Sequence, residues 1–446
     1  MSYEPPVPPE TRLPNSHAQR SLLCSRRPPR PCVTAAIELS GPVREDMLRA
    51  RLAEVVRCRP ALRSRFTSEE EHSIAAVAEA GFACHLVEGS EPESWSRAYE
   101  MAAEDATRRF PAGQSPLVRL AVFTTRHGRH LLVVDADPLV CDAWSANLLV
   151  DDLLGEERRG EPDDYVEVWR ARQAWVDGPG HAEALDRRLR SVKGAWRQWP
   201  VSVGTSGPCP DPRADLPGGH IDIDVETATA LRERVRKARG SMLAVAAAAL
   251  RMAFAGALPA PLALTTTFAA RETQAEAAVV GLLATEGVLA LPPLSGTVND
   301  YLRVLRDEIF AALADQRLPY ESVAPHLGGP AAGLSMALLY LPEQLTGGKQ
   351  RDLLVGTARA ARTGLMICPS GADVDLFMLE QPPPVEDGLR PALRLGAQSG
   401  SSAVDDATVN HILHGWARMV HVLAGQNWSA RQAASLSPAG HARIAH

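Results

Sequence analysis

The chain repeats one structural pattern, a short alternating strand followed by an amphipathic helix, at two distant places. In residues 34–66, apolar residues alternate up to a Gly-Pro turn and then recur at helical spacing. Residues 219–240 repeat this order, with Ile221 and Ile223 alternating with acids before a helical period begins. A chain of 446 residues is also too long for one ordinary core. The repeat and the length together predict two lobes.

The stretch between the two repeats, residues 201–219, is rich in glycine and proline and shows no period, so it predicts a loop that joins the lobes. We therefore expect an N-terminal lobe over residues 1–180, a helix end and linker over 181–219, and a C-terminal lobe over 220–446.

Apolar periods predict the elements of each lobe. In the N-terminal lobe they indicate strands near 33–39, 118–124 and 130–135, and helices near 45–57, 95–109, 144–153 and 163–192. In the C-terminal lobe they indicate strands near 220–224, 261–267, 334–341 and 373–380, and helices near 226–238, 241–256, 297–315 and 405–424. Because strands and helices do not alternate regularly, the predicted fold class is α+β.

Composition excludes several classes of protein. A hydrophobic content of 45% with 22% charged residues is typical of a globular chain, and a net charge of -6 argues against a nucleic-acid partner. The seven cysteines are odd in number and form no C-x-x-C pair, which favours reduced thiols over disulfides or a zinc site. The first residues do not show the charged start and apolar middle expected of a signal peptide. The most apolar span, residues 242–258, is broken by Arg251 and predicts a buried helix. We expect a cytoplasmic protein.

The segment LLVVDADPLVCDAWSANLLVDDL, residues 131–153, places carboxylates on both sides of an apolar turn. The strand is expected to end at Pro138, and a helix to begin after Asp142. For Asp142, helix capping or a buried ion pair is the favoured interpretation. Asp137 lies beside an apolar loop, where desolvation can raise its pKa and make it a general acid or base. Cys141 has no nearby basic partner and is expected to be a packed thiol.

Three segments carry a resemblance to a known family. LPNSHAQRSLL resembles a first motif, AAIELSGPVREDMLRARLAEVVRCRPALRSRF a strand, helix and arginine-rich segment, and VVGLLATEGVLALPPLSGTVNDYLRVLRDEIFAALADQRLPYESVAPHL a later block. In this order and spacing they resemble a condensation domain of nonribosomal peptide synthetases, here standing alone. The resemblance runs from about residue 12 to 437.

The acidic segment departs from the signature usual in that superfamily, His-His-x-x-x-Asp-Gly. The second histidine, usually assigned to catalysis, is Pro138 here, which puts histidine-assisted condensation in doubt. One branch, the heterocyclization domains, carries Asp-x-x-x-x-Asp-x-x-Ser instead, and Asp137, Asp142 and Ser145 satisfy that pattern.

The resemblance implies a fold of two chloramphenicol acetyltransferase-like lobes that form a V-shaped pseudo-dimer. It implies donor and acceptor carrier proteins as partners, with substrates held on their phosphopantetheine arms, and no bound cofactor or metal. Neither nucleic acid nor membrane is an expected partner, and we expect a monomer. The implied reaction joins a carrier-bound acyl thioester to the amine of a carrier-bound Cys, Ser or Thr. Ring closure to a thiazoline or oxazoline would follow, and carboxylates suit its proton transfers.

The resemblance also suggests roles for single residues. Asp142 is expected to pair with Arg271 and hold the loop. Ser145 is expected to cap the helix, bind substrate, or both. A later catalytic acid is expected at Asp375 or Asp373, within ICPSGADVDLFMLEQ, where Cys368-Pro369 would replace the family's Thr-Pro.

Other features favour different functions. The family's late Phe-Thr-Ser segment corresponds to GLSMALLYLPEQL, residues 333–345, which has no threonine. Two alternatives therefore stay open beside heterocyclization: condensation without ring closure onto this or another acceptor, and a catalytically silent module that docks carrier proteins.

Overall fold

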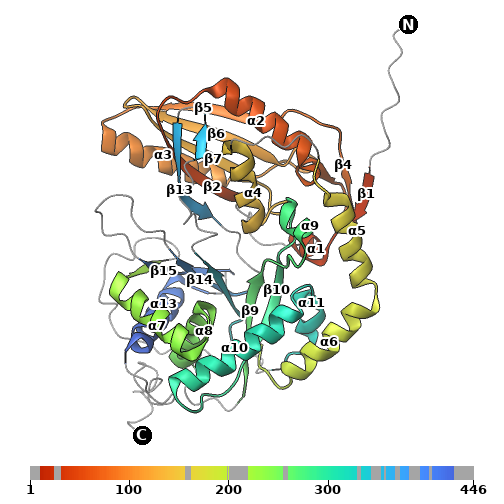
Figure 1. The fold of residues 1–446 in the computed structure, drawn as a ribbon, viewed down its shortest axis with the longest axis vertical. Helices are drawn as coiled ribbons and strands as arrows, with labels where there is room; N and C mark the ends of the chain where they lie inside the picture. The colour runs from red at the N-terminus through yellow and green to blue at the C-terminus, as the bar shows by residue number, and fades with distance from the viewer. Residues whose placement is uncertain are drawn as a thin grey trace. The chain divides into compact units, whose positions relative to one another are not determined.

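The computed structural model describes residues 11–24, 32–155, 162–197, 199, 219–254, 260–328, 333–342, 353–355, 358–366, 372–380, 392–400 and 404–425. The chain divides into two compact units (Figure 1). Unit 1 comprises residues 1–178, 271–284 and 349–368, and unit 2 comprises residues 179–270, 285–348 and 369–446.

Unit 1 is built on a six-stranded sheet of order β12-β13-β2-β7-β6-β5. Its strands are β2 (Val33–Ser40), β5 (Gly81–Val87), β6 (Val118–Thr125), β7 (Arg129–Ala136), β12 (Leu353–Val355) and β13 (Ala358–Met366). Strand β7 lies between β2 and β6 and is antiparallel to both. The residues that end β7 are therefore held by hydrogen bonds from two sides.

Alternation along β7 gives the sheet two apolar faces. Leu132 and Val134 pack in the cluster that contains residues of α2 (Glu45–Cys58) and α4 (Ala143–Leu154). Leu131 and Val133 pack on the other face with residues of α3 (Glu91–Ala106). Side chains of a strand point alternately to the two faces, so a strand covered by helices on both sides is apolar at nearly every position.

A smaller part of unit 1 surrounds a three-stranded sheet of order β1-β4-β3. It contains β1 (Thr11–Pro14), β3 (Ser64–Phe66), β4 (Glu71–Ile74), α1 (His17–Cys24), η1 (Pro60–Arg63), α5 (Tyr165–Val176) and α9 (Gln274–Ala278). Leu13, Tyr165, Trp169 and Leu283 meet in one buried apolar cluster. This cluster joins segments that are far apart in the sequence.

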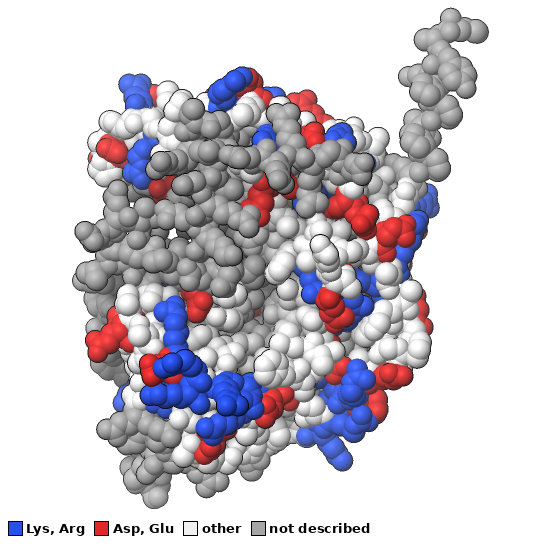
Figure 2. Space-filling model, viewed as in Figure 1, with Lys and Arg blue, Asp and Glu red and all other residues white. Residues whose placement is uncertain are grey.

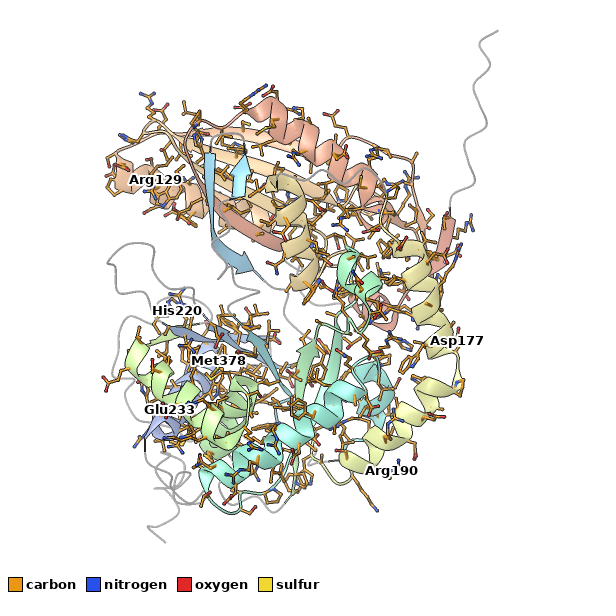
Figure 3. The ribbon with its side chains drawn as sticks, viewed as in Figure 1. Arg129, Asp177, Arg190, His220, Glu233 and Met378 are labelled. Atoms are coloured by element: carbon orange, nitrogen blue, oxygen red, sulfur yellow. The ribbon has the colours of Figure 1, made fainter. Side chains whose placement is uncertain are left out.

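Unit 2 has a six-stranded sheet of order β10-β9-β11-β14-β15-β8. The strands are β8 (His220–Ile223), β9 (Leu262–Phe268), β10 (Thr285–Leu291), β11 (Met336–Leu341), β14 (Val374–Glu380) and β15 (Leu393–Ser399). The helices are α6 (Pro179–Ser191), α7 (Val225–Ala238), α8 (Met242–Phe254), α10 (Val298–Ala314), α11 (Tyr320–Val323), η2 (Ala324–His326) and α13 (Asp406–Ala424). Met378 of β14 lies in the core, whereas Arg190 lies on the outer side of α6 (Figure 3).

The helix at 242–254 shows why that apolar stretch is not a membrane span. Residues 244–250 are fully buried within unit 2, and Trp416 of α13 donates a hydrogen bond to the Ala246 carbonyl at 2.9 Å. Small alanine side chains let the helix approach its neighbours closely. Among the residues that the structure describes, no helix is long and apolar enough to cross a membrane.

The mixed helix and sheet fold agrees with the predicted α+β class, and the predicted strands and helices are present with small shifts at their ends. One predicted element is wrong: the helix over 163–192 is two helices, α5 and α6, interrupted at residues 177–178. A Cβ on Gly178 would lie 2.9 Å from the Ala174 carbonyl oxygen, so the chain leaves the helical path there. Strands β5, β10, β13 and β15, and the short strands β1, β3, β4 and β12, were not predicted.

The grouping into units differs from the linear division expected from the sequence. Residues 271–284 and 349–368 belong to unit 1, although they follow most of unit 2 in the chain. Strand β13 pairs with β2, and Arg271 bonds to Asp142, so both segments are tied to the N-terminal part. Helix α6, which the linear division splits between lobe and linker, belongs to unit 2. The linker stretch 200–218 lies outside the described residues.

Candidate active site

The acidic turn, residues 137–142, begins where β7 ends between β2 and β6. Asp135, two residues before Asp137, is buried. Its carboxylate accepts hydrogen bonds from Thr34 Oγ1 at 2.5 Å and Arg119 Nε at 3.0 Å. Burial raises the pKa of Asp135 and outweighs the lowering effect of these two partners. The end of β7 therefore carries the buried carboxylate of Asp135, which has hydrogen-bond partners and lies beside the turn.

Asp137 is the first residue of the turn and is half-buried. Its backbone N–H donates to the Leu117 carbonyl at 3.0 Å, which continues the β6–β7 ladder by one residue. Its Oδ1 accepts a hydrogen bond from the Leu139 N–H at 2.9 Å. This local bond closes an Asx turn across Pro138, a residue that itself has no N–H to donate. The carboxylate is thus held by the backbone and remains partly exposed.

Cys32, which directly precedes β2, does not supply a nucleophile. Its side chain is buried, and burial together with the Asp135 charge raises the pKa of its thiol to about 12. Cys141 is also buried, in the apolar cluster beneath α4, with its Sγ 3.5 Å from the Asp142 carbonyl oxygen. The described cysteines 24, 32, 58, 84 and 141 are all free thiols.

Asp142 ends the turn and caps α4, with its Oδ1 accepting from the Ser145 N–H at 2.8 Å. Its carboxylate also accepts two hydrogen bonds from Arg271, at 2.9 and 3.1 Å. The backbone N–H groups of Leu283 and Ala284 donate to Oδ2 at 3.0 and 2.9 Å. Burial opposes the charged form, but Arg271 and these donors outweigh it and hold the pKa of Asp142 below its ordinary range. Asp142 therefore stays ionised and cannot exchange protons near neutral pH.

Ser145 is fully buried, and its hydroxyl is used entirely within the protein. Its Oγ donates to the Gly281 carbonyl at 2.8 Å and accepts from the Gly281 N–H at 3.0 Å. It also accepts from Arg271 Nη2 at 2.9 Å. The structure thus brings together Asp142, Ser145 and Arg271 as one anchor for the 271–284 segment, and it leaves Ser145 no hydroxyl hydrogen for a substrate.

A second anchor of the same segment was not predicted from the sequence. Arg59 is fully buried and donates to Asp152 at 2.6 Å, to Asp163 at 2.9 Å and to the Ala278 carbonyl at 2.6 Å. Asp163 in turn accepts the Val280 N–H at 3.1 Å. These residues are widely separated in the chain and show no common period, so their proximity could not be read from the sequence. The 271–284 segment is consequently held at residues 278 and 280 in addition to the residues bound by the first anchor.

Close packing of the 271–284 segment also requires a glycine. A Cβ on Gly281 would lie 2.9 Å from the ring of the buried Tyr165. The segment passes over this ring, and its backbone reaches the Ser145 hydroxyl only because residue 281 has no side chain.

The later acids lie in unit 2. Asp373 accepts hydrogen bonds from the Ser335 N–H at 2.9 Å and from the Ser335 hydroxyl at 2.7 Å, so it joins the starts of β11 and β14. Asp375 is a buried residue of β14, paired with Ala337 on one side and Gln398 on the other. Cys368 and Pro369, expected beside them, lie outside the described residues, as do residues 343–345.

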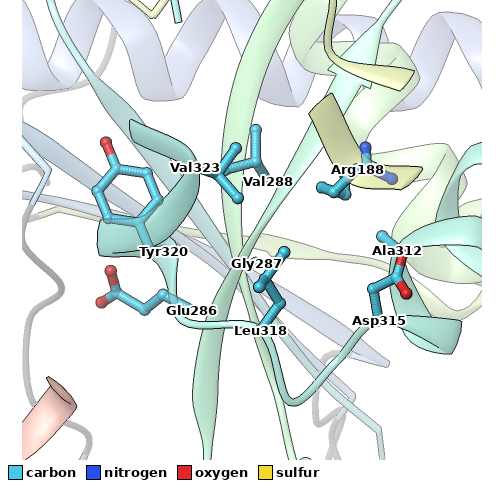
Figure 4. A pocket seen from close by; sticks show the side chains of 9 residues that line it. All are labelled: Arg188, Glu286, Gly287, Val288, Ala312, Asp315, Leu318, Tyr320 and Val323. Carbon is cyan, nitrogen blue, oxygen red and sulfur yellow. The ribbon is translucent and has the colours of Figure 1, made fainter. Parts of the chain in front are cut away.

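A small cavity in unit 2 is lined by residues of β10, α10 and α11 together with Arg188 of α6 (Figure 4). Its volume is about 10 Å³. This is about the space that one water molecule needs, so the cavity does not hold a substrate. Among the described residues, no group of three or more His, Cys, Asp or Glu side chains could hold a metal ion.

Comparisons with known proteins agree with this fold. Residues 11–155 match the family model of the condensation domain. One of the linear gramicidin synthase proteins of Brevibacillus parabrevis is 23% identical over 202 residues, which are 41% of this chain and 3% of that protein. The chain thus spans a small part of the length of the curated relatives it matches.

Solved condensation domains resemble most of the chain in fold. The condensation domain of the Monacolin K polyketide synthase MokA superposes with a TM-score of 0.73 at 15% identity, covering 93% of this chain and 97% of that one. The first condensation domain of the calcium-dependent antibiotic synthetase, in complex with a substrate analogue, gives a TM-score of 0.71 at 17% identity, covering 95% and 99%. Residues 11–155 are thus similar to the condensation-domain family, and the chain shares the fold of these solved condensation domains.

Proposed function

We propose that this protein joins a carrier-bound acyl thioester to the amine of a carrier-bound Cys, Ser or Thr, and then closes the acceptor side chain onto the new amide with loss of water. The observation that carries this proposal is the pattern of Asp137, Asp142 and Ser145 at the end of β7, within the segment that matches the condensation family. Asp142 and Ser145 are buried anchors, whereas Asp137 is partly exposed. Asp137 is therefore the member of the pattern that can reach a substrate.

In amide formation, the acceptor amine attacks the thioester carbon and the donor carrier's phosphopantetheine thiolate leaves. The proton lost by the amine passes to the Asp137 carboxylate and from there to the thiolate. In ring closure, the acceptor thiol or hydroxyl adds to the amide carbon, and its proton passes to the former amide oxygen. That oxygen takes up a second proton and leaves as water, while the nitrogen loses its N–H proton and forms the C=N bond of the ring. One carboxylate that alternates between base and acid serves both steps. No cofactor takes part.

Condensation without ring closure is the second candidate function, and a specific observation favours it. The segment over residues 333–345 lacks the threonine that the resemblance leads one to expect, and Cys368-Pro369 stands where Thr-Pro is expected. Under this candidate the reaction stops at the amide, and Asp137 serves only the first proton transfer.

The proposed partners are carrier proteins, which the resemblance implies to be acidic. Figure 2 shows Lys and Arg side chains gathered over the part of unit 2 that contains α7 and α10. Arg236 and Lys237 of α7 are largely exposed, and Arg303 of α10 is about half exposed. A basic surface of this kind complements an acidic partner and speeds its association. Residues 25–31, the other basic segment, lie outside the described residues.

Intact-protein mass spectrometry tests the proposal. A donor carrier loaded with an acyl group and an acceptor carrier loaded with Cys, Ser or Thr are mixed with this protein. An acceptor-bound acyl product lighter by one water than the simple amide supports heterocyclization, and a product of the full amide mass supports the second candidate. No product with any donor, alongside measurable carrier binding, contradicts both and leaves a docking module.

A further inference from the structure

The role of Gln19 in the segment LPNSHAQRSLL is not explained by the reaction. Gln19 lies on α1 and is fully buried. Its Nε2 donates a hydrogen bond to the Leu139 carbonyl, inside the acidic turn, at 2.8 Å. Its Oε1 accepts from the Ser16 N–H at 3.1 Å. An N–H can only pair with the amide oxygen and a carbonyl only with the amide nitrogen, so the two partners fix the orientation of this side chain.

The Leu139–Val140 peptide that Gln19 contacts is held on its other side by Asp137. The Val140 N–H donates to the Asp137 carbonyl at 2.9 Å, and the Leu139 N–H donates to the Asp137 carboxylate at 2.9 Å. Gln19 holds the carbonyl of this peptide, and Asp137 holds its N–H. A rotation of the peptide would break both contacts, and the turn that carries the Asp137 carboxylate would lose its fixed geometry.

Further buried polar groups surround Gln19 and keep it in place. The Tyr165 side chain interacts electrostatically with Gln19, and its hydroxyl lies 3.4 Å from His72 Nε2. His72 Nδ1 lies 2.8 Å from Asn15 Oδ1, and the His72 ring packs against Phe66 and Trp169. Burial lowers the pKa of His72 to about 4. The network is therefore neutral near pH 7, and each member has a partner, which is the condition for a rigid buried polar network.

We propose that Gln19 is a positioning residue: it fixes the Leu139–Val140 peptide and thereby the direction of the Asp137 carboxylate. The proposal rests on the proposed function, in which Asp137 transfers the protons. Gln19 touches no substrate and acts through the turn.

A first experiment measures how rigidly the acidic turn is held, and it does not depend on any catalysed reaction. Amide hydrogen exchange is measured on peptides covering residues 134–143 in the wild type and in Gln19→Met, which keeps the length of the side chain and removes its donor. Trp416→Phe is the matched control, since it removes a buried hydrogen bond in unit 2, from the Trp416 indole to the Ala246 carbonyl at 2.9 Å, that does not involve the turn. We expect exchange in the turn about tenfold faster in Gln19→Met, as the loss of one hydrogen bond implies. Equal exchange in the wild type and Gln19→Met overturns the proposal.

A second experiment separates positioning from a merely structural role. In Gln19→Glu the side chain keeps its size but donates only when protonated, and burial raises the pKa of a glutamic acid. We expect kcat of Gln19→Glu to be reduced near pH 8 and to recover toward wild type near about pH 6, where the protonated carboxyl can donate to Leu139. The kcat of Gln19→Met is expected to stay low at both pH values. In both variants, KM for the carrier proteins is expected to be unchanged.

A kcat of Gln19→Glu that follows the same pH profile as Gln19→Met contradicts the proposal. If the wild type forms no product, the proposed function fails, and the exchange measurement alone decides whether Gln19 fixes the turn.

Discussion

The two ends of the acidic turn differ in how their carboxylates are held. Asp142, at the start of α4, is buried and accepts hydrogen bonds from Arg271 and from three backbone N–H groups. Asp137, five residues earlier, is half-buried, and its carboxylate accepts the Leu139 N–H. One carboxylate is enclosed by groups that stabilise its charge, and the other lies partly open at the surface of the turn.

This difference teaches that a short motif can combine two kinds of residue. The ionised form of Asp142 is so strongly favoured that it suits an anchor and not a proton carrier. A general acid or base needs to change its charge during the reaction, which a partly exposed carboxylate does more readily than a buried one paired with an arginine. In the proposed function, Asp137 carries the chemistry, and Asp142 and Ser145 hold the structure of the site.

The largest effect on stability is expected from breaking the buried ion pair between Arg271 and Asp142. Arg271→Leu strands the Asp142 carboxylate in the core, and the free energy of unfolding should fall by about 3–5 kcal/mol. Asp142→Asn combined with Arg271→Leu removes both charges and should restore part of this loss. Denaturant unfolding checks both variants. A loss under about 1 kcal/mol for Arg271→Leu would show that Asp142 is not enclosed as described.

As the pH falls, the buried network around His72 and Gln19 is expected to lose stability before Asp142 loses its charge. The pKa of His72 is about 4 in the folded protein, below its ordinary value, so the unfolded chain binds more protons and stability falls as pH falls from 6.5 toward 4. The shift corresponds to a loss of about 3 kcal/mol, complete below the folded pKa. Asp142 keeps its charge over this range because its pKa is lowered. Unfolding free energies measured across pH test this.

The non-titrating variant His72→Gln is the control for the acid effect. It should lose most of the slope of stability against pH between about pH 6.5 and 4. An unchanged slope would assign the acid sensitivity to other groups.

Removal of the Ser145 hydroxyl is expected to lower the free energy of unfolding by less than loss of Arg271 or acidification does. Ser145→Ala leaves the Gly281 N–H and carbonyl without their buried partner, which should cost about 1–3 kcal/mol. Thermal or denaturant unfolding measures this. Ser145→Cys, which keeps a weak donor and acceptor, should lose less, and equal stability of Ser145→Ala and the wild type would make a substrate role for the hydroxyl the better account.

The smallest effect on stability is expected at the other end of the turn. Asp137→Asn keeps an oxygen that can accept the Leu139 N–H, so the free energy of unfolding should change by under about 1 kcal/mol. A loss as large as that of Arg271→Leu would refute the contrast between the two carboxylates.

The sequence predicted the local structure of the site well because short-range patterns determine it. The strand that ends before Pro138 and the helix capped by Asp142 follow from apolar periods and capping chemistry. The two helices in place of one over 163–192, and the missed β13, show the limit of periodicity. Strand β13 pairs with β2 across more than three hundred residues, and no local pattern encodes such a partner.

Contacts between side chains far apart in the sequence could be predicted only in part. The contact of Arg271 with Asp142 was expected because the resemblance supplies a position for the arginine. The buried cluster of Arg59 with Asp152 and Asp163, and the bond from Gln19 to Leu139, were not expected. Arginine, aspartate and glutamine are usually exposed, so their sequence positions give no sign that they are buried and paired.

The most direct test of the account compares acyl transfer by the wild type, Asp137→Asn and Trp416→Phe on loaded carrier proteins, with the acceptor-bound product measured by mass spectrometry. We predict that Asp137→Asn forms product at least about a hundredfold more slowly than the wild type, as expected when a general acid or base is lost. Trp416→Phe should retain the wild-type rate, and Asp137→Asn should unfold at nearly the wild-type denaturant concentration. Product formation by Asp137→Asn at the wild-type rate would contradict the assignment of the chemistry to Asp137.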